Sequence, residues 1–246
     1  MNRLIGQAVA VTALGVLATA LTPACAENDQ SIFVRSVLAP ALNRQNGVCT
    51  YTADVTQPMI SQGVIDIGIT DSYVAPLLVG NQLIPRGTAQ GARAESNRAR
   101  LNGAVVRVTD PTGATLSEFT ALGSGFVDPA LNNLPSYGPF FVTVLDPASV
   151  QRIAEQVPVG QTRLLVANIK VFGQTLGGVD LETGEFQYPI RVCNGCLVSF
   201  ETGDDTTSQE RDCSLPLGDN SQGPCAIGQD EPTPCQLCRG RPVCDG

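Results

Sequence analysis

The stretch Phe186-Gln187-Tyr188-Pro189-Ile190-Arg191-Val192 decides the fold class. Its apolar side chains occupy alternate positions, and successive side chains of a β-strand point to opposite faces of the sheet. The alternation therefore predicts a strand with one buried face. Because Pro189 has no N–H to donate, we expect this strand to lie at a sheet edge or to carry a bulge.

The same alternation recurs through much of residues 30–200. One face of a second strand is formed by Leu165, Ala167, Ile169 and Val171, and the other by Asn168 and Lys170. Further strands are expected at Ile32–Leu38, Val48–Ala53, Ile65–Ile69, Val74–Val79, Phe140–Leu145 and Leu197–Phe200. Between Ala99 and Val108 the apolar positions change phase at Gly103, which predicts a β-bulge. Many short strands separated by turns predict an antiparallel β-sandwich, Ig-like or jelly-roll-like.

Turn and helix signals divide these strands. The order of residues in Asp110–Gly113 is typical of a type I turn, and Glu182–Glu185 is a hairpin candidate. Two glycine-rich segments, Leu122–Phe126 and Gly173–Gly178, are interpreted as a glycine turn and a loop between strands. The one helix signal lies at Asp146-Pro147-Ala148-Ser149, leading into Val150–Gln156, where Asp146 can cap the helix and Pro147 suits its first position.

The start of the chain has the layout of an export signal. Arg3 precedes an apolar run from Leu4 to Leu21, and the run ends at Thr22-Pro23-Ala24-Cys25-Ala26. Cleavage after Ala26 would release a soluble protein. Cleavage before Cys25 would make Cys25 a lipidated first residue, and this lipoprotein is the interpretation we favour. A membrane span is the third alternative, although 18 residues are close to the minimum length.

The cysteines support export. Nine are present, and eight remain once Cys25 is set aside: Cys49, Cys193, Cys196, Cys213, Cys225, Cys235, Cys238 and Cys244. An even set in an exported chain predicts a disulfide framework. We expect a local Cys193–Cys196 pair, because Asn194-Gly195 can make a tight turn, and we expect Cys49 to reach one of the five cysteines that follow Glu201.

Two CxxC motifs, at 193–196 and 235–238, also allow other chemistry. Paired CxxC motifs can bind zinc as four thiolates, and a single CxxC can exchange thiols and disulfides. The long spacing and the surrounding cysteines favour disulfides instead. We therefore predict neither a metal nor a cofactor.

Composition excludes several classes of function. The chain has no His, which removes Ser-His-Asp and Cys-His catalysis and all His metal ligands. It has no cluster of Lys or Arg, so nucleic acid is not an expected partner. The single Lys, Lys170, is expected to point outward from its strand. Ser124 lies between two glycines but is not part of a G-x-S-x-G motif.

Negative charge is concentrated near the C-terminus. Residues 201–246 hold nine Asp or Glu and three Arg, which gives −6 of the total formal charge of −8. Two groups of carboxylates could attract a divalent cation: Asp204, Asp205, Glu210 and Asp212, and the group Asp180, Glu182 and Glu185. Neither has the EF-hand spacing, so solvated acidic loops are expected. We divide the chain into a signal (1–26), a sandwich (27–200) and an acidic cystine-rich tail (201–246).

Four segments carry a resemblance. Ser31–Arg35, Leu77–Leu83, Gly123–Pro129 and Pro189–Cys196 resemble uncharacterised exported proteins of myxobacterial type, probable lipoproteins with no assigned activity. The resemblance implies an envelope or secreted location and brings no catalytic residues.

The sequence therefore predicts a structural or binding protein, not an enzyme. Its location would be the cell envelope, lipid-anchored in the outer membrane or periplasm, or outside the cell, with a membrane contact only through Cys25 and an envelope or extracellular partner. Two alternatives stay open. One is a carboxylate hydrolase, which needs two Asp or Glu side chains in a cleft, one of them with a raised pKa. The other is a thiol-disulfide oxidoreductase that uses a CxxC motif.

Overall fold

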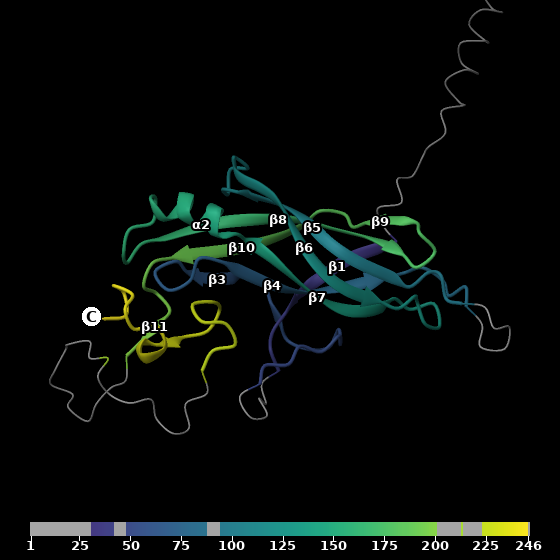
Figure 1. Ribbon diagram of the computed structural model, residues 1–246, viewed down its shortest axis with the longest axis horizontal. Helices are drawn as coiled ribbons and strands as arrows, with labels where there is room; N and C mark the ends of the chain where they lie inside the picture. The colour runs from purple at the N-terminus through teal and green to yellow at the C-terminus, as the bar shows by residue number, and fades with distance from the viewer. Residues whose placement is uncertain (1–30, 42–47, 88–93, 201–212, 214–222, 246) are drawn as a thin grey trace, which may run out of the picture.

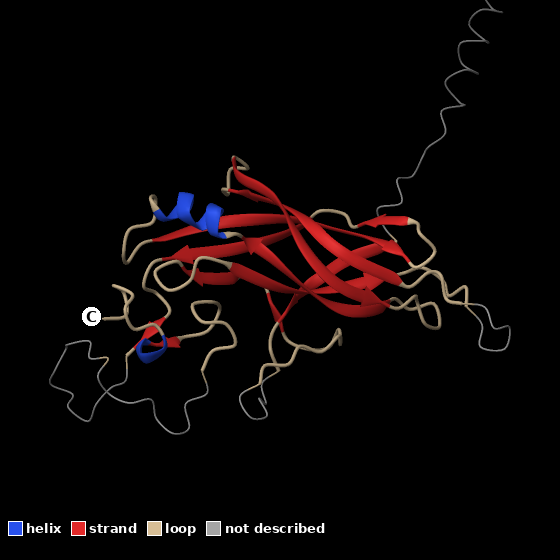
Figure 2. Cartoon of the chain, in the orientation of Figure 1, coloured by secondary structure: helices blue, strands red, loops and turns tan. Residues whose placement is uncertain are grey.

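The protein is a β-sandwich with one short α-helix and a disulfide-rich C-terminal tail, as the sequence predicts (Figures 1 and 2). The computed structural model describes residues 31–41, 48–87, 94–200, 213 and 223–245. The predicted signal and Cys25 lie outside this range. No helix in the described part of the chain is long and apolar enough to cross a membrane.

Two sheets form the sandwich. The smaller has the order β2-β1-β4-β7, made of β1 (Ile32–Leu38), β2 (Met59–Ile60), β4 (Tyr73–Asn81) and β7 (Ser136–Leu145). The larger has the order β3-β10-β8-β5-β6, made of β3 (Gly63–Asp66), β5 (Ala99–Thr109), β6 (Thr115–Val127), β8 (Thr162–Thr175) and β10 (Phe186–Cys193), with β9 (Asp180–Glu182) also paired to β8. In the tail, β11 (Val198–Ser199) pairs with β12 (Thr233–Pro234), and a 3-10 turn follows at Cys235–Leu237.

Most neighbouring strands are antiparallel, but β3 runs parallel to β10, with Ile190 opposite Gly63. The core between the sheets is one cluster of buried apolar residues drawn from both of them. Its largest members include Tyr73, Leu77 and Phe140 from the smaller sheet, and Leu101, Leu165, Ile169 and Tyr188 from the larger. The alternating residues 165, 167, 169 and 171 are all fully buried, which confirms the predicted inner face of β8.

The predicted bulge lies in β5. The register of β5 with both β6 and β8 shifts between Leu101 and Gly103. A Cβ on Gly103 would lie 2.5 Å from the carbonyl oxygen of Ala121, so only glycine fits at the shift. Pro189 lies in an interior strand, but β3 pairs with β10 only from Ile190 onward. At Pro189 the strand therefore has a free side where no N–H is required.

The glycine turn predicted at Leu122–Phe126 is wrong, because these residues continue β6. A Cβ on Gly123 would lie 2.7 Å from the ring of buried Phe140 in β7, and one on Gly138 would lie 2.6 Å from the carbonyl oxygen of Phe126. The glycines therefore serve a close approach of β6 to β7. This contact closes one side of the sandwich, at the edges of the two sheets.

Adding a methyl group at Gly123 is expected to destabilise the protein. The Gly123→Ala substitution pushes Cβ into the Phe140 ring, and such overpacking costs about 1–3 kcal/mol of the free energy of unfolding. Gly184→Ala is the control, since a Cβ there meets nothing within 4 Å. Urea unfolding of both variants measures the difference, and equal stability of the two would refute the close-approach role.

Two further local predictions are wrong, and a third is right only in part. Val48–Ala53 forms no strand, and its Cys49 is instead bonded to the tail. Glu182–Glu185 is no hairpin, since β9 and β10 follow one another along the same strand, β8. The chain reverses instead between β8 and β9, where Gly178 has a φ of 83°. The loop predicted at Gly173–Gly178 is right for its last three residues, which lie in this turn, and wrong for its first three, which still belong to β8.

The helix and the β5–β6 turn agree with the sequence. Helix α2 (Pro147–Ala154) begins after Asp146, whose side chain accepts a hydrogen bond from the Ser149 N–H at 3.0 Å. Between β5 and β6, the Gly113 N–H donates to the Asp110 carbonyl at 3.0 Å.

Candidate functional site

The tail is attached to both sheets through two adjacent residues, Gln229 and Asp230, which we call the clip. The side-chain amide of Gln229 bonds to the backbone of Val74 in the way that a neighbouring strand would. Its oxygen accepts from the Val74 N–H at 3.0 Å, and its nitrogen donates to the Val74 carbonyl at 2.7 Å. Val74 belongs to β4 of the smaller sheet. The backbone of the same residue forms an antiparallel bridge with Ile65 of β3 in the larger sheet. Gln229 therefore joins the two sheets.

Asp230 continues this attachment. Its N–H donates to the Val64 carbonyl at 2.9 Å, and its carboxylate accepts from the Val64 N–H at 2.8 Å. The Tyr73 hydroxyl also donates to the carboxylate, at 2.8 Å to Oδ2. Since Tyr73 has one proton to give, the Tyr188 hydroxyl donates to the Tyr73 oxygen at 3.0 Å. A chain of polar contacts thus runs from the tail through β4 to β10.

Burial raises the pKa values of the three side chains in this series of hydrogen bonds. It raises the pKa of the Asp230 carboxyl above its ordinary value, and hydrogen bonds from Val64 and Tyr73 only partly oppose the rise. Burial, followed by the nearby Asp230 charge, also raises the pKa of Tyr73 far above the ordinary value for a phenol. The pKa of Tyr188 is raised mainly by burial. Both phenols therefore stay protonated and act as donors.

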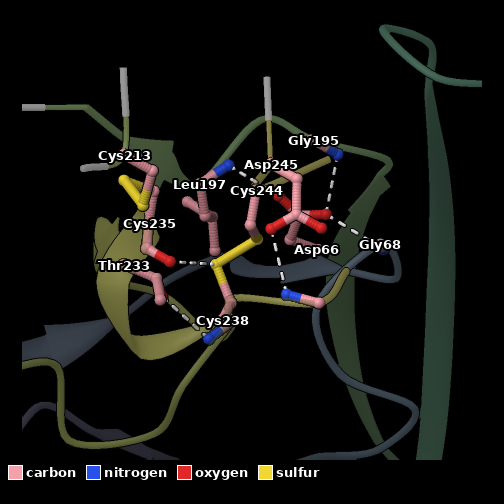
Figure 3. Close-up of a disulfide and its surroundings, with 12 residues drawn as sticks. Asp66, Gly68, Gly195, Leu197, Cys213, Thr233, Cys235, Cys238, Cys244 and Asp245 are labelled. Atoms are coloured by element: carbon pink, nitrogen blue, oxygen red, sulfur yellow. Dashed lines mark hydrogen bonds between the residues drawn. A yellow bond between two sulfur atoms is a disulfide. The ribbon is translucent and has the colours of Figure 1, made fainter. Parts of the chain in front are cut away.

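A second buried carboxylate, Asp66, organises the first CxxC motif. Its Oδ1 accepts from the Gly195 N–H at 2.7 Å and the Gly68 N–H at 3.1 Å, and its Oδ2 accepts from the Leu197 N–H at 2.8 Å (Figure 3). Asp66 is fully buried at the end of β3. The strand expected at Ile65–Ile69 ends here, because the chain turns and the Ile69 N–H donates to the Asp66 carbonyl.

All eight cysteines set aside for disulfides are paired. The bonds are Cys49–Cys225, Cys193–Cys196, Cys213–Cys235 and Cys238–Cys244. They include the local pair and the link from Cys49 to the tail that the sequence predicts. Cys235, Cys238 and Cys244 pack with Ile69 of the body in a second, small apolar cluster. The two cysteines of the first CxxC motif bond to each other, and those of the second bond to Cys213 and Cys244, so none of the four is left as a thiolate for zinc.

The Cys193–Cys196 disulfide is the part of the structure closest to redox or metal chemistry. A carboxylate oxygen of Asp66 and the two sulfur atoms lie within 4.8 Å of one another, and no other such group of possible ligands occurs among the described residues. Cys193 is buried and Cys196 is exposed. Reduction would place thiolates beside a negative carboxylate, which disfavours the thiolate form that reacts. Asp66 therefore favours the oxidised, structural form.

Replacing Asp66 by asparagine is expected to loosen this loop. An amide N–H₂ in the place of Oδ2 cannot accept from the Leu197 N–H, and one buried donor without a partner costs about 1–3 kcal/mol. Asp71→Asn, at an exposed position nearby, is the control. Chemical denaturation of both variants gives the difference, and a stable Asp66→Asn variant would show that the three bonds to Asp66 do not hold the loop.

A surface groove lies between the tail and the outer face of the smaller sheet. Its volume is about 360 Å³, and its walls include Tyr51, Val74, Pro76, Phe141, Ile227 and Gln229. The Tyr51 and Phe141 rings meet edge to face, with centroids 5.3 Å apart. A smaller recess of about 20 Å³ adjoins it and is lined in part by Asp230 and Glu231. That volume holds about one water molecule.

The other predicted candidates are not brought together. Glu182 pairs with Lys170 at 2.6 Å, Glu185 pairs with Arg107 at 2.7 Å, and Asp180 accepts from the Gln174 amide. Lys170 points outward from β8, as predicted. Ser124 lies within β6. The acidic group Asp204, Asp205, Glu210 and Asp212 lies outside the described residues.

The sequence did not single out the clip, Asp66 or the two tyrosines. Asp230 has a left-handed φ of 60°, which Asp tolerates better than most residues, but only the structure reveals this angle. Comparison of the chain with protein-family models, with curated proteins and with solved structures finds no match.

Proposed function

We propose that this chain is an exported, non-catalytic protein of the cell envelope or the extracellular space that acts as a structural or binding module. One observation carries the proposal: β1, the first strand, begins beside β9, at the opposite end of the sandwich from the disulfide-linked tail (Figure 1). Such an arrangement suits an anchored protein that presents its tail away from the anchor.

The location is supported by chemistry. Four disulfides in one chain indicate an oxidising, non-cytoplasmic compartment. The signal-like residues 1–26 and the position of Cys25 extend this to a lipid anchor in the outer membrane or periplasm. Mass spectrometry of the mature N-terminus tests the anchor. A diacylglycerol-modified Cys25 is expected, a start at Glu27 would replace the anchored form by a secreted one, and an intact Met1 would refute export.

Recognition is proposed to involve the tail. Its sequence charge of −6 favours cationic partners or divalent ions, and such binding weakens as salt screens the charges. A fluorescent oligolysine peptide is a suitable probe. We expect binding at low salt that is lost at high salt, and weaker binding by the variant Glu201→Gln, Asp204→Asn, Asp205→Asn. Binding that is insensitive to both changes would contradict the proposal.

A carboxylate hydrolase is a second candidate, favoured by the raised pKa of Asp230 next to Glu231 in a surface recess. Against it, both Asp230 oxygens already accept hydrogen bonds from the protein, and Glu231 accepts from the Cys225 N–H at 2.7 Å. A screen against glycosides, esters and peptides separates the two functions. Turnover that disappears in both Asp230→Asn and Glu231→Gln would establish the hydrolase.

A thiol-disulfide oxidoreductase is the third candidate, favoured by the exposed position of residue Cys196. Its test is the rate of exchange with reduced glutathione. Rapid catalysed exchange that is abolished by Cys196→Ser would establish it, whereas the non-catalytic proposal expects a slow stoichiometric reduction.

A further inference from the structure

Large apolar side chains are gathered on the loops at the end of the sandwich where the chain begins its first strand. Five of them form what we call the apolar end: Ile84 (72% exposed), Leu131 (68%), Leu134 (68%), Leu176 (53%) and Val179 (63%). They come from three separate connections: the one after β4, the one between β6 and β7, and the turn between β8 and β9. Each side chain is exposed where burial would be favourable.

Backbone contacts place these loops next to one another. The Ala130 N–H donates to the Leu83 carbonyl at 2.8 Å, which joins the β6–β7 connection to the residues after β4. The Leu176 N–H donates to the Arg98 carbonyl at 2.9 Å, and the Asn97 side chain donates to the Ile84 carbonyl at 2.7 Å. The five apolar side chains therefore belong to one continuous part of the surface.

The two leucines between β6 and β7 are held rigidly at the tip of a tight turn. Asn132 and Asn133 both have left-handed backbone angles, with φ of 51° and 64°. Leu131 and Leu134 exchange two backbone hydrogen bonds, at 2.8 and 2.9 Å. Two successive left-handed residues are typical of a type I′ hairpin turn, for which asparagine is well suited. The turn thus presents two leucines to the outside in a fixed geometry.

The described part of the chain begins with Ser31 at this same end. The Ser31 carbonyl accepts from the Gln82 N–H at 2.9 Å, two residues before Ile84. Cys25 precedes Ser31 by six residues, a length of chain that spans about 20 Å at most. A lipid on Cys25 would therefore hold a membrane surface within reach of the apolar end. Figure 1 shows the tail at the opposite end of the sandwich.

We propose that the apolar end binds the surface of a lipid bilayer. Its leucines and valine would enter the boundary between headgroups and acyl chains, as the apolar faces of peripheral membrane segments do. Arg86 and Arg100 are exposed at this end and suit the lipid phosphates. A lipid on Cys25 holds the protein at one point, and the apolar end would add a second contact with the same membrane. This inference rests on the proposed envelope location.

Tryptophan fluorescence offers a direct test, since the chain contains no Trp. Leu134→Trp and Val179→Trp report on the apolar end. Leu122→Trp, in the middle of β6, and Val159→Trp, after α2, are exposed controls at 83% and 68%. A hexahistidine tag inserted between Ala26 and Glu27 of the full-length chain attaches it to vesicles of phosphatidylethanolamine and phosphatidylglycerol that contain a nickel-chelating lipid. The chain has no His of its own, so the attachment does not depend on lipidation.

We expect a blue shift and quenching by brominated acyl chains at positions 134 and 179, and neither change at 122 and 159. In the Val179→Trp protein, adding Leu131→Ser and Leu134→Ser is expected to abolish the shift. Without the tag, the same double change is expected to weaken vesicle binding by about tenfold or more. No shift at 134 and 179 in vesicle-bound protein, or equal shifts at all four positions, would overturn the proposal. A shift at 134 with an unmodified Cys25 would keep the apolar end and refute the lipid anchor.

Discussion

Replacing Cys49 and Cys225 together by alanine is expected to lower the free energy of unfolding by about 5 kcal/mol. The two cysteines are 176 residues apart, and a bond that closes so long a loop removes much of the freedom of the unfolded chain. Cys49 lies in a segment without strand structure, so this bond is its covalent attachment to the tail. Urea unfolding under non-reducing conditions measures the change.

The matched control is the double replacement of Cys238 and Cys244, which are only six residues apart. The shorter loop predicts a loss of about 2 kcal/mol. Equal losses for the two pairs would show that loop length does not determine what these disulfides contribute, and that local packing in the tail does.

The Asp230→Ala substitution is the second change with a large expected effect, about 3–5 kcal/mol. It leaves the Val64 N–H and the Tyr73 hydroxyl without their acceptor, and each buried donor without a partner costs about 1–3 kcal/mol. Alanine also adopts the left-handed φ at this position poorly. Asp230→Asn keeps one acceptor oxygen and the tolerated backbone angle, so a smaller loss of about 1–2 kcal/mol is expected. Unfolding and protease cleavage of the tail would report both effects.

The difference in stability between the natural protein and Asp230→Asn should change with pH in a definite direction. Because the folded-state pKa of Asp230 is raised, its contribution to stability is fully present below the ordinary carboxyl pKa of 3.8. The contribution is lost as the pH rises through the raised pKa. The stability of the natural protein relative to Asp230→Asn should therefore be highest in acid and fall as the pH rises above 3.8. A difference that grows with pH would contradict the raised pKa.

Local patterns in the sequence predict a large part of this fold. The inner faces of β8 and β10, the bulge at Gly103 and the Asp146 cap all follow from residues within a few positions of each other. Gly123 and Gly125 were misinterpreted because glycine has two uses, reversal of the chain and close approach of a neighbour. The second use depends on Phe140, which lies on another strand.

The candidate site could not be predicted either, because its contacts also join residues that are far apart in the sequence. Asp66 accepts from Gly195, 129 positions later, and Asp230 accepts from Val64, 166 positions earlier. Neither carboxylate has a neighbour in the sequence that signals its role. The cysteines differ because their even number predicts a disulfide framework without knowledge of the fold.

The position of β3 has a consequence for the time at which the protein can fold. One side of β3 pairs with β10, and the other is covered by residues 228–230, whose backbone and side chains bond to Val64 and Asp66. Neither partner exists until most of the chain has been synthesised, so a nascent chain keeps this strand unsatisfied on both sides. An unpaired strand edge is a template for pairing with other copies of the chain, so delayed oxidation of Cys225 should increase aggregation during folding.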